Sequence, residues 1–323
     1  MKRWVLLIAG GLCFAIFIYR IDYGGFLWVQ KISIERLICI VGINGAVLIL
    51  KAWRWRYLLS RLNIHLGNRR LFSAVSAGMY LGLVSPGTSG EFGRMIRVPV
   101  KASSGFVTIA LEKFTDFGVL LVISIVGMLY WFSPSRYAFL IAISSVIVIG
   151  VLMYFSGRVK MRILSCGEWV SKRLLKKELA LGEMFAFLGK RDTLFISLVV
   201  SFLLWVIPGV QYYLICKGIH MDIGVKSIIL SLYTPYLAGV LSMIPFGIGV
   251  FEIGASHLLG GMSAEQDAIG ASLLLFRLLT TLPLVLFGLV SFVHVMLGRE
   301  GESRVKETPY VREEKEEAQS RLS

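Results

Sequence analysis

Charged side chains within or beside long apolar stretches are the residues of this sequence whose types and spacing could do chemistry. A charge at membrane depth costs about 2.5–3.5 kcal/mol on insertion scales, so it marks a pathway or a binding site by default. A guanidinium holds two phosphate oxygens at once, whereas a carboxylate takes a cationic group or a coupling proton. The residues that we expect to contact substrate in a polar cavity are Glu91, Arg94, Arg97, Glu112, Asp116, Glu252 and Arg277.

The spacing of four of these residues places them on shared helix faces. Arg94 and Arg97 are three residues apart, and Glu112 and Asp116 are four apart. Residues at these separations are neighbours on the surface of a helix. Arg94 and Arg97 also fit a second interpretation, in which they are an ordinary cytoplasmic anchor beside a membrane span.

A pairing interpretation stands beside the binding interpretation. Glu91 would pair with Arg94, three residues later. Arg277 would pair with either Glu252 or Asp116. The two interpretations are compatible, because intramembrane charges both pair with one another and mark substrate pathways.

Two apolar stretches are each interrupted by a cluster of proline and glycine with a glutamate just beyond it. Inside a bilayer, non-helical backbone must be buried in protein or line a wet cavity. One such interruption in each half of a chain points to a transporter's binding site. We expect Gly87 and Gly247 to allow backbone angles or close approaches that larger residues cannot adopt. The predicted backbone breaks are Pro86, Gly87 and Gly90 in the first cluster and Pro245, Gly247 and Gly249 in the second.

The composition indicates an integral membrane protein. The chain has 323 residues, of which 56% are hydrophobic and 17% are charged, and its mean hydropathy is +0.74. The net charge of +14 comes from basic residues clustered beside apolar spans, as the positive-inside rule requires, so we expect no nucleic-acid partner. The cysteines and histidines lack metal-ligand spacing and no phosphate-binding loop is present, so we expect no metal, no cofactor and no ATP site.

We therefore expect an all-α polytopic membrane protein with about six full transmembrane helices and two re-entrant hairpins. The hairpins are the broken stretches 71–101 and 226–260, although 226–243 is long enough to cross by itself. Basic loops at 51–70 and 156–192 belong in the cytoplasm, and counting crossings then makes the hairpins enter from opposite faces, as in an inverted repeat. The full spans are predicted at 4–20, 34–55, 106–132, 137–155, 193–216 and 268–297.

This topology predicts a multi-pass protein of the cytoplasmic membrane with both termini in the cytoplasm. Residues 1–298 form one transmembrane domain, and no small-residue cleavage site follows the first span. Residues 299–323 mix acidic and basic side chains with almost no apolar ones, which predicts a disordered tail. The segment 156–192 fits an amphipathic helix on the inner leaflet, or equally a solvated helix that packs on the ends of the bundle.

A tryptophan–arginine motif lies at the end of the second predicted span. Trp53 and Trp55 alternate with Arg54 and Arg56. Aromatic and basic side chains are enriched where a helix meets the membrane–water interface. We interpret the motif as an interfacial anchor.

An enzyme motif also overlaps the first break. The run Gly87-Thr88-Ser89-Gly90 is similar to the G-x-S-G of intramembrane serine proteases, and His294 in the last span is a candidate base. A four-residue match in a glycine-rich break is weak support for catalysis. His294 fits an interfacial position better, because it lies near the cytoplasmic end of its span.

The order of these motifs resembles the transmembrane region of lysylphosphatidylglycerol synthases, a family of flippase-like integral membrane proteins. The family's P-G-x-x-G-E-x-x-R element matches residues 86–94, and its E-R-x-x-D element matches residues 112–116. Its P-x-G-x-G-x-x-E element matches residues 245–252, and Arg277 matches the arginine of its final long span. The sequence departs from the pattern at Lys113, where arginine is usual, and at Ser85, where leucine is common.

The resemblance covers roughly residues 1–298 and implies that the protein moves a lipid across the membrane. The implied cargo is an aminoacyl phospholipid or a polyprenyl-phosphate-linked lipid, such as a sugar carried on polyprenyl phosphate, so the expected partners are membrane lipids with a phosphate head group. A lipid-modifying synthase or glycosyltransferase is a further implied partner. Synthase activity is not implied, since the chain shows only a short tail where full synthases have a soluble aminoacyl-transferase domain. The alternative function is an intramembrane enzyme, or an accessory subunit of a lipid-linked glycosyltransferase.

Overall fold

A computed structural model describes residues 30, 32–95, 98, 100, 102–132, 191–261 and 266–297. These residues form helices and connecting turns with no β-strand among them, which confirms the all-α prediction for this part of the chain. The predicted spans 4–20 and 137–155, nearly all of the segment 156–192, and the tail 299–323 lie outside the described residues.

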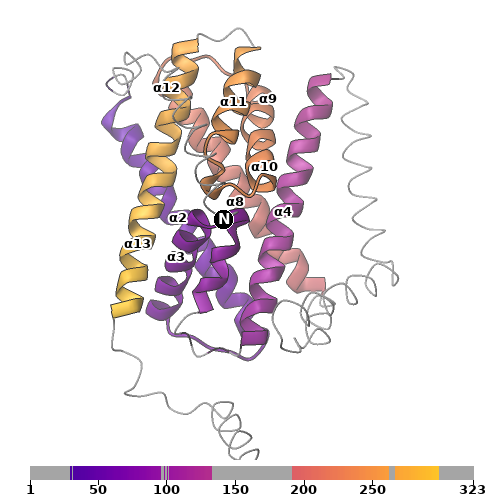
Figure 1. The fold of residues 1–323 in the computed structure, drawn as a ribbon, viewed down its shortest axis with the longest axis vertical. Coiled ribbons are helices and arrows are strands. Elements are labelled where there is room, and N and C mark those ends of the chain that lie inside the picture. The colour runs from indigo at the N-terminus through magenta and orange to yellow at the C-terminus, as the bar shows by residue number, and fades with distance from the viewer. Residues whose placement is uncertain are drawn as a thin grey trace, which may run out of the picture.

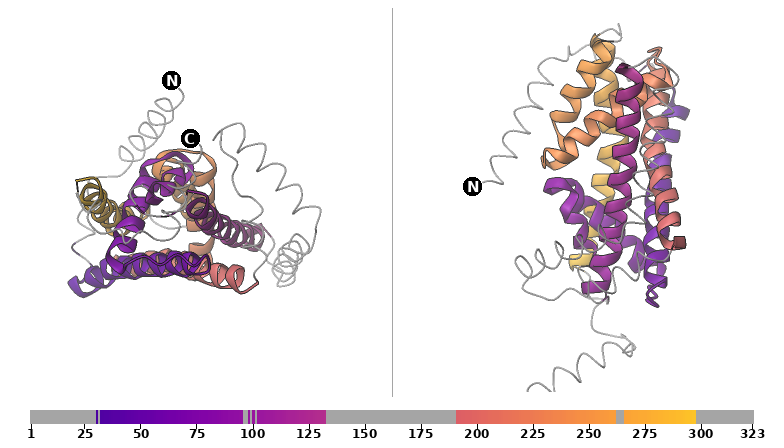
Figure 2. Two further views of the ribbon diagram at one scale, coloured as in Figure 1. Left: turned by 90° about the horizontal axis from the view of Figure 1, so that it is seen from below. Right: turned by 90° about the vertical axis from the view of Figure 1, so that its right-hand side faces the viewer.

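Long helices form the frame of the described part, and most of them run along its long axis (Figures 1 and 2). They are α2 (Ile34–Ser60), α4 (Ala102–Phe132), α8 (Arg191–Gly218), and a last helix in which α12 (Gln266–Phe276), η6 (Arg277–Thr281) and α13 (Leu282–Leu297) follow without a gap. α8 and the last helix are long and apolar enough to cross a membrane. At 1.5 Å per residue α8 extends about 42 Å, more than the roughly 30 Å hydrocarbon core of a bilayer.

α2 and α8 run antiparallel, which defines the two ends of the bundle. Near the start of α2, Arg36 donates to the backbone carbonyl of Lys217 at the end of α8. Just beyond the end of α2, Arg61 pairs with Asp192 in the first turn of α8, with 3.4 Å between Nη2 and Oδ2. Residues 61–67 and 191 therefore lie at one end, and residues 33 and 218 lie at the other.

The first break makes the chain fold back on itself after α3 (Asn68–Val84). Ser85 is extended, at φ −106° and ψ 151°, because the following proline disfavours helical backbone. The return segment η2 (Pro86–Met95) is a 3₁₀ helix that packs on α3 through small residues. A Cβ atom on Gly82 would lie 2.4 Å from Glu91 Cγ, and one on Gly90 would lie 2.0 Å from the Leu81 carbonyl oxygen.

An unusual backbone angle of the first break lies at Thr88, next to Gly87. Thr88 has a φ of 59°. A β-branched residue with positive φ is an outlier that costs on the order of 1–3 kcal/mol and persists only when its surroundings enforce it. The expectation that Gly87 allows unusual backbone angles or close approaches stays a prediction, and the strain of this break lies at its neighbour Thr88.

The second break divides the stretch 225–260 into two helical arms. The first arm comprises α9 (Val225–Ile228), the π-helical turn η4 (Ile229–Tyr233) and α10 (Thr234–Leu241), and the second arm is α11 (Val250–Gly260). The turn η5 (Pro245–Gly247) connects them. Gly247 and Gly249 have φ of 60° and 85°, as expected for glycines at a break.

The two broken segments approach each other from opposite ends of the bundle. In Figure 1, α3 occupies the lower half, whereas α10 and α11 occupy the upper half. Their tips touch, since η5 contacts both α3 and η2. Within the second tip, Gly247 lies against Gly239, since an added Cβ on Gly247 would lie 3.1 Å from the Gly239 Cα.

Candidate functional site: a charged cavity between the two broken segments

Arg94, near the end of η2, lies between two carboxylates. Its Nη2 is 2.7 Å from Glu91 Oε2, and its Nη1 is 2.7 Å from Glu112 Oε2. The guanidinium carbon lies 5.3 Å from the centroid of the Trp55 ring. All four side chains are buried. A buried charge is tolerated only when it is paired and hydrogen-bonded. The pair of Arg94 with Glu112 therefore stabilises the contact between the first broken segment and α4.

Arg54 of α2 holds Asp116 of α4 in a bidentate pair. Nη1 donates to Oδ1 at 2.7 Å, and Nη2 donates to Oδ2 at 3.0 Å. The same Nη1 donates to Ser201 of α8, which in turn donates to Asp116 Oδ1. Arg54 Nε lies 3.6 Å from Glu112 Oε1, an ion pair without a hydrogen bond. Arg54 therefore joins α2, α4 and α8 at one buried point.

The interfacial-anchor interpretation is wrong for Arg54 and Trp55. α2 continues to Ser60, five residues beyond the predicted end of its span. Its helical period turns Arg54 and Trp55 inward and leaves Trp53 and Arg56 exposed. Trp55 Nε1 donates to Thr108 Oγ1 of α4 at 3.1 Å, so this side chain belongs to the core.

Two lysines share the oxygen of Glu91 that faces away from Arg94. Lys51 Nζ lies 3.4 Å from Glu91 Oε1, and Lys113 Nζ contacts the same atom. The lysine side chains are 14% and 25% exposed, whereas Glu91 is 7% exposed. One carboxylate is thus surrounded by three cations, two of which remain partly accessible.

Arg277 and Glu252 form the ion pair of the second broken segment. Arg277 Nε lies 2.7 Å from Glu252 Oε1, and Glu252 Oε2 accepts a 2.6 Å hydrogen bond from the backbone N–H of Gly249. The guanidinium carbon lies 4.5 Å from the centroid of the Phe251 ring. Of the pairings open for Arg277, the structure thus has Glu252, since Asp116 is held by Arg54. Arg277 Nη2 is buried and has no hydrogen-bond partner among the described residues.

Arg277 lies at the start of a π-helical turn that is fixed from outside the helix. Such turns are rare and occur frequently at functional sites. The side-chain amide of Asn44 on α2 donates to the Leu279 carbonyl at 2.8 Å. Gln211 of α8 donates to Asn44 Oδ1 at 3.0 Å, which orients that amide. The turn is therefore held by two buried amides that also line the cavity described next.

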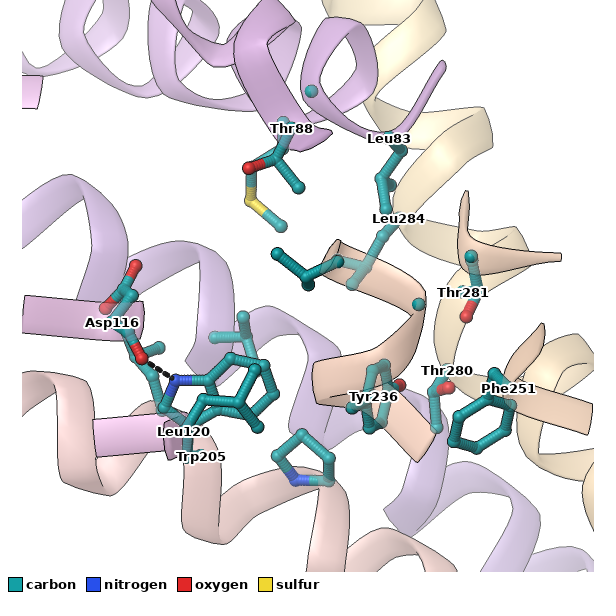
Figure 3. Close-up of a pocket in the computed structure, with 18 of the residues that line it drawn as sticks. Leu83, Thr88, Asp116, Leu120, Trp205, Tyr236, Phe251, Thr280, Thr281 and Leu284 are labelled. Carbon is teal, nitrogen blue, oxygen red and sulfur yellow. Dashed lines mark hydrogen bonds between the residues drawn. The ribbon is translucent and has the colours of Figure 1, made fainter. Parts of the chain in front are cut away.

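A cavity of about 280 Å³ lies where the tips of the two broken segments meet (Figure 3). Thr88 and Leu83 approach it from the first broken segment, and Tyr236 and Phe251 from the second (Figure 3). Much of the wall is apolar. The ionic side chains that line it are Lys51, Glu91, Lys113, Asp116 and Arg277. The cavity therefore joins a charged surface to an apolar one, which suits an amphiphile.

The sequence of this chain matches a known protein family. The lysylphosphatidylglycerol synthase transmembrane region matches residues 4–288. The chain belongs to this family. A UPF0104 membrane protein of Methanothermobacter thermautotrophicus is 25% identical over 242 residues, which are 66% of this chain and 71% of that protein. A UPF0104 membrane protein of Pyrococcus horikoshii is 23% identical over 324 residues, covering 90% of this chain and 96% of that protein. The chain is accordingly a membrane protein.

The motif segments of this lysylphosphatidylglycerol synthase transmembrane-region protein meet around the cavity. Glu91, Asp116 and Arg277 line it. Arg94 pairs with Glu91 and also with Glu112, and neither Arg94 nor Glu112 is among the lining residues. Glu252 likewise pairs with a lining residue, Arg277, without lining the cavity itself. Arg97 lies outside the described residues. The predicted site residues therefore fall into two ion-pair groups that share one cavity.

Three cations of the site were missed when the sequence was considered alone. Lys51 and Arg54 belong to the basic stretch 51–70 that is predicted to be a cytoplasmic loop, and Lys113 stands beside Glu112 and Asp116 without a predicted role. The available signal was helical periodicity, because Asn44, Leu48, Trp55 and the two basic residues follow one face of α2 if the helix is extended to Ser60.

The structure gives no support to a Ser89–His294 catalytic pair. Thr88, next to Ser89, lines the cavity together with Leu284 of α13. His294 lies ten residues further along that helix, which corresponds to about 15 Å. His294 is exposed, consistent with an interfacial side chain.

Proposed function

We propose that this protein translocates a lipid with a phosphate head group across the membrane. The observation that carries the proposal is the cavity at the meeting point of the two broken segments, with ionic groups on part of its wall and apolar side chains on the rest. A lipid in transit needs both surfaces at once, because its head group must leave water while its chains stay in hydrocarbon. Membership of the lysylphosphatidylglycerol synthase transmembrane-region family supports a role connected with lipids.

Arg277 is the proposed contact for the phosphate. Its Nε is used by Glu252, but its Nη2 is a buried donor without a partner among the described residues. An unsatisfied buried donor costs roughly 1–3 kcal/mol. An anionic oxygen that accepts a hydrogen bond from Nη2 would remove this cost, which favours binding of a phosphate at this position. Glu252 and the Asn44–Leu279 contact hold the guanidinium in place for that ligand.

The proposed topology follows from the same arrangement. The two broken segments would be re-entrant hairpins inserted from opposite faces of the cytoplasmic membrane, among about six full spans. Both termini would be cytoplasmic. The antiparallel α2 and α8 and the tip-to-tip contact of the two breaks support this inverted arrangement. An inverted repeat with its site near the midplane allows access to alternate between the two sides.

Reconstitution in liposomes tests the proposal. Purified protein is incorporated with a fluorescent phospholipid, and an impermeant reductant then measures how much of the lipid becomes accessible from outside. Wild-type protein should increase the accessible fraction beyond that of protein-free liposomes, and Arg277→Gln should lower the rate. Mass spectrometry of the extracted lipid distinguishes the enzymatic alternative, because translocation leaves the lipid unchanged. A new covalent product without translocation contradicts the proposal.

A further inference from the structure

The positive and negative charges of the side chains that line the cavity, and of their ion-pair partners, are unequal in number. Each carboxylate of the described part that belongs to the site has at least one cationic partner within 4 Å. Among the described residues of the site, cations outnumber carboxylates by one, so this part of the site has an excess positive charge. The cations are Lys51, Arg54, Arg94, Lys113 and Arg277, and the carboxylates are Glu91, Glu112, Asp116 and Glu252.

The excess charge is located at the two lysines. Arg54 and Arg94 are buried and pair with carboxylates, and their side chains are 0% and 1% exposed. Lys51 and Lys113 instead compete for a single oxygen of Glu91. Both line the cavity and are its most accessible cations near that carboxylate. An ammonium group has three donors, so each lysine keeps donors that Glu91 does not use.

We propose that Lys51 and Lys113 form an anion-binding subsite, and that the cavity selects lipids whose head group has a net negative charge. This inference rests on the proposed function and narrows its substrate class. Of the two lipid classes that the resemblance in sequence implies, an anionic phosphate lipid neutralises the excess charge. An aminoacyl phospholipid with a net positive head group adds to it, because it brings ammonium groups next to two lysines.

The source of the anion is a lipid and not free phosphate, because the cavity wall beyond the lysines is apolar. Phe117, Leu120 and Leu204 line it on the side of α4 and α8. A free phosphate ion would lose water at this surface and gain no contacts there. A lipid chain would cover the same surface favourably.

A matched pair of lipids tests the selection directly. Phosphatidylglycerol and lysylphosphatidylglycerol have the same phosphodiester and the same chains, and differ only by the lysyl group. Binding of each to purified protein in a neutral detergent is measured by native mass spectrometry, with inorganic phosphate as a third probe. We expect wild type to bind phosphatidylglycerol roughly tenfold more tightly than lysylphosphatidylglycerol, a factor that one favourable charge contact supplies. Inorganic phosphate should not compete at equal concentration.

Variants of the lysines assign the effect to the subsite. Lys51→Gln and Lys113→Gln should each weaken phosphatidylglycerol binding roughly tenfold and reduce the difference between the two lipids. Lys113→Arg keeps the charge and should retain the wild-type preference. The matched control is Lys217→Gln, which removes a lysine that pairs with Asp222 away from the cavity and should change nothing. Thermal unfolding of each variant shows that it is folded.

The outcomes separate this inference from the proposed function. Equal or tighter binding of lysylphosphatidylglycerol by wild type overturns the inference, and so do folded Lys→Gln variants with unchanged preference. Translocation of lysylphosphatidylglycerol alone would leave the proposed function standing while contradicting the subsite. Selective binding of phosphatidylglycerol without any translocation would support the subsite and contradict the transport role.

Discussion

At the residue scale, a substitution of Arg277 tests whether this side chain contacts the ligand or only forms a structural ion pair. Arg277→Lys keeps one positive charge for Glu252 but loses the planar group that carries the buried Nη2, which has no hydrogen-bond partner among the described residues. We expect translocation to fall roughly tenfold while the amount of folded protein stays the same. The rate is measured in liposomes and divided by the amount of reconstituted protein.

A double variant provides the control for this prediction. Arg277→Gln alone leaves Glu252 as a buried charge without its partner, which costs about 3–5 kcal/mol. Arg277→Gln combined with Glu252→Gln should recover much of that stability, although not the transport. If Arg277→Lys is silent and the double variant regains both stability and transport, the pair is only structural and Arg277 does not hold phosphate.

Arg54 is the residue whose loss should most affect folding. Arg54→Gln leaves Asp116 without its bidentate partner and removes the second cation of Glu112, which keeps only Arg94. We expect the free energy of unfolding to drop by about 3–5 kcal/mol. Arg56→Gln, two positions away on the exposed face of α2, should change it by no more than about 0.5 kcal/mol. Unfolding in detergent compares the two, and equal effects would contradict the buried role of Arg54.

At the scale of elements, the second break depends on the backbone of Gly247. Gly247→Ala adds a Cβ to a residue with φ of 60° and places it 3.1 Å from the Cα of Gly239. The left-handed conformation alone costs roughly 1–2 kcal/mol for a residue other than glycine. We expect the variant to lose most transport, because the tip of this segment forms part of the cavity wall.

The control for the break is a glycine inside a helix. A Cβ on Gly45, in the middle of α2, meets no atom within 4 Å. Gly45→Ala should therefore be neutral or stabilise the helix by up to about 1 kcal/mol. Transport per folded molecule is compared for the two variants. Full activity of Gly247→Ala would mean that the break is a simple kink.

At the scale of the whole molecule, the inverted arrangement predicts which ends of the bundle face the cytoplasm. His65 follows α2 at the end where α8 begins, and Asp222 follows α8 at the opposite end. In a background without native cysteines, His65→Cys should be protected from impermeant thiol reagents in intact cells, whereas Asp222→Cys should be labelled. The positive-inside rule supplies this orientation. Labelling of both positions from outside, or the reverse pattern, would refute the proposed topology.

Much of the fold followed from the sequence by itself. The long helices begin and end within about five residues of the predicted spans in the described part, because their apolar length is a local property of the chain. The two backbone breaks are also local, since Pro86 and Pro245 each make the preceding residue extended. Glu91 with Arg94 was available from spacing, because residues three apart on a helical turn are neighbours.

Only the tertiary structure decided which distant charges meet. Asp116 pairs with Arg54 instead of Arg277, although 62 residues separate the first two. Lys51 and Arg54 join the site because α2 packs its last turns against α4. A helix period shows which side chains share a face, but it does not say which neighbour covers that face. That choice depends on how the helices pack, and therefore on contacts between residues far apart in the chain.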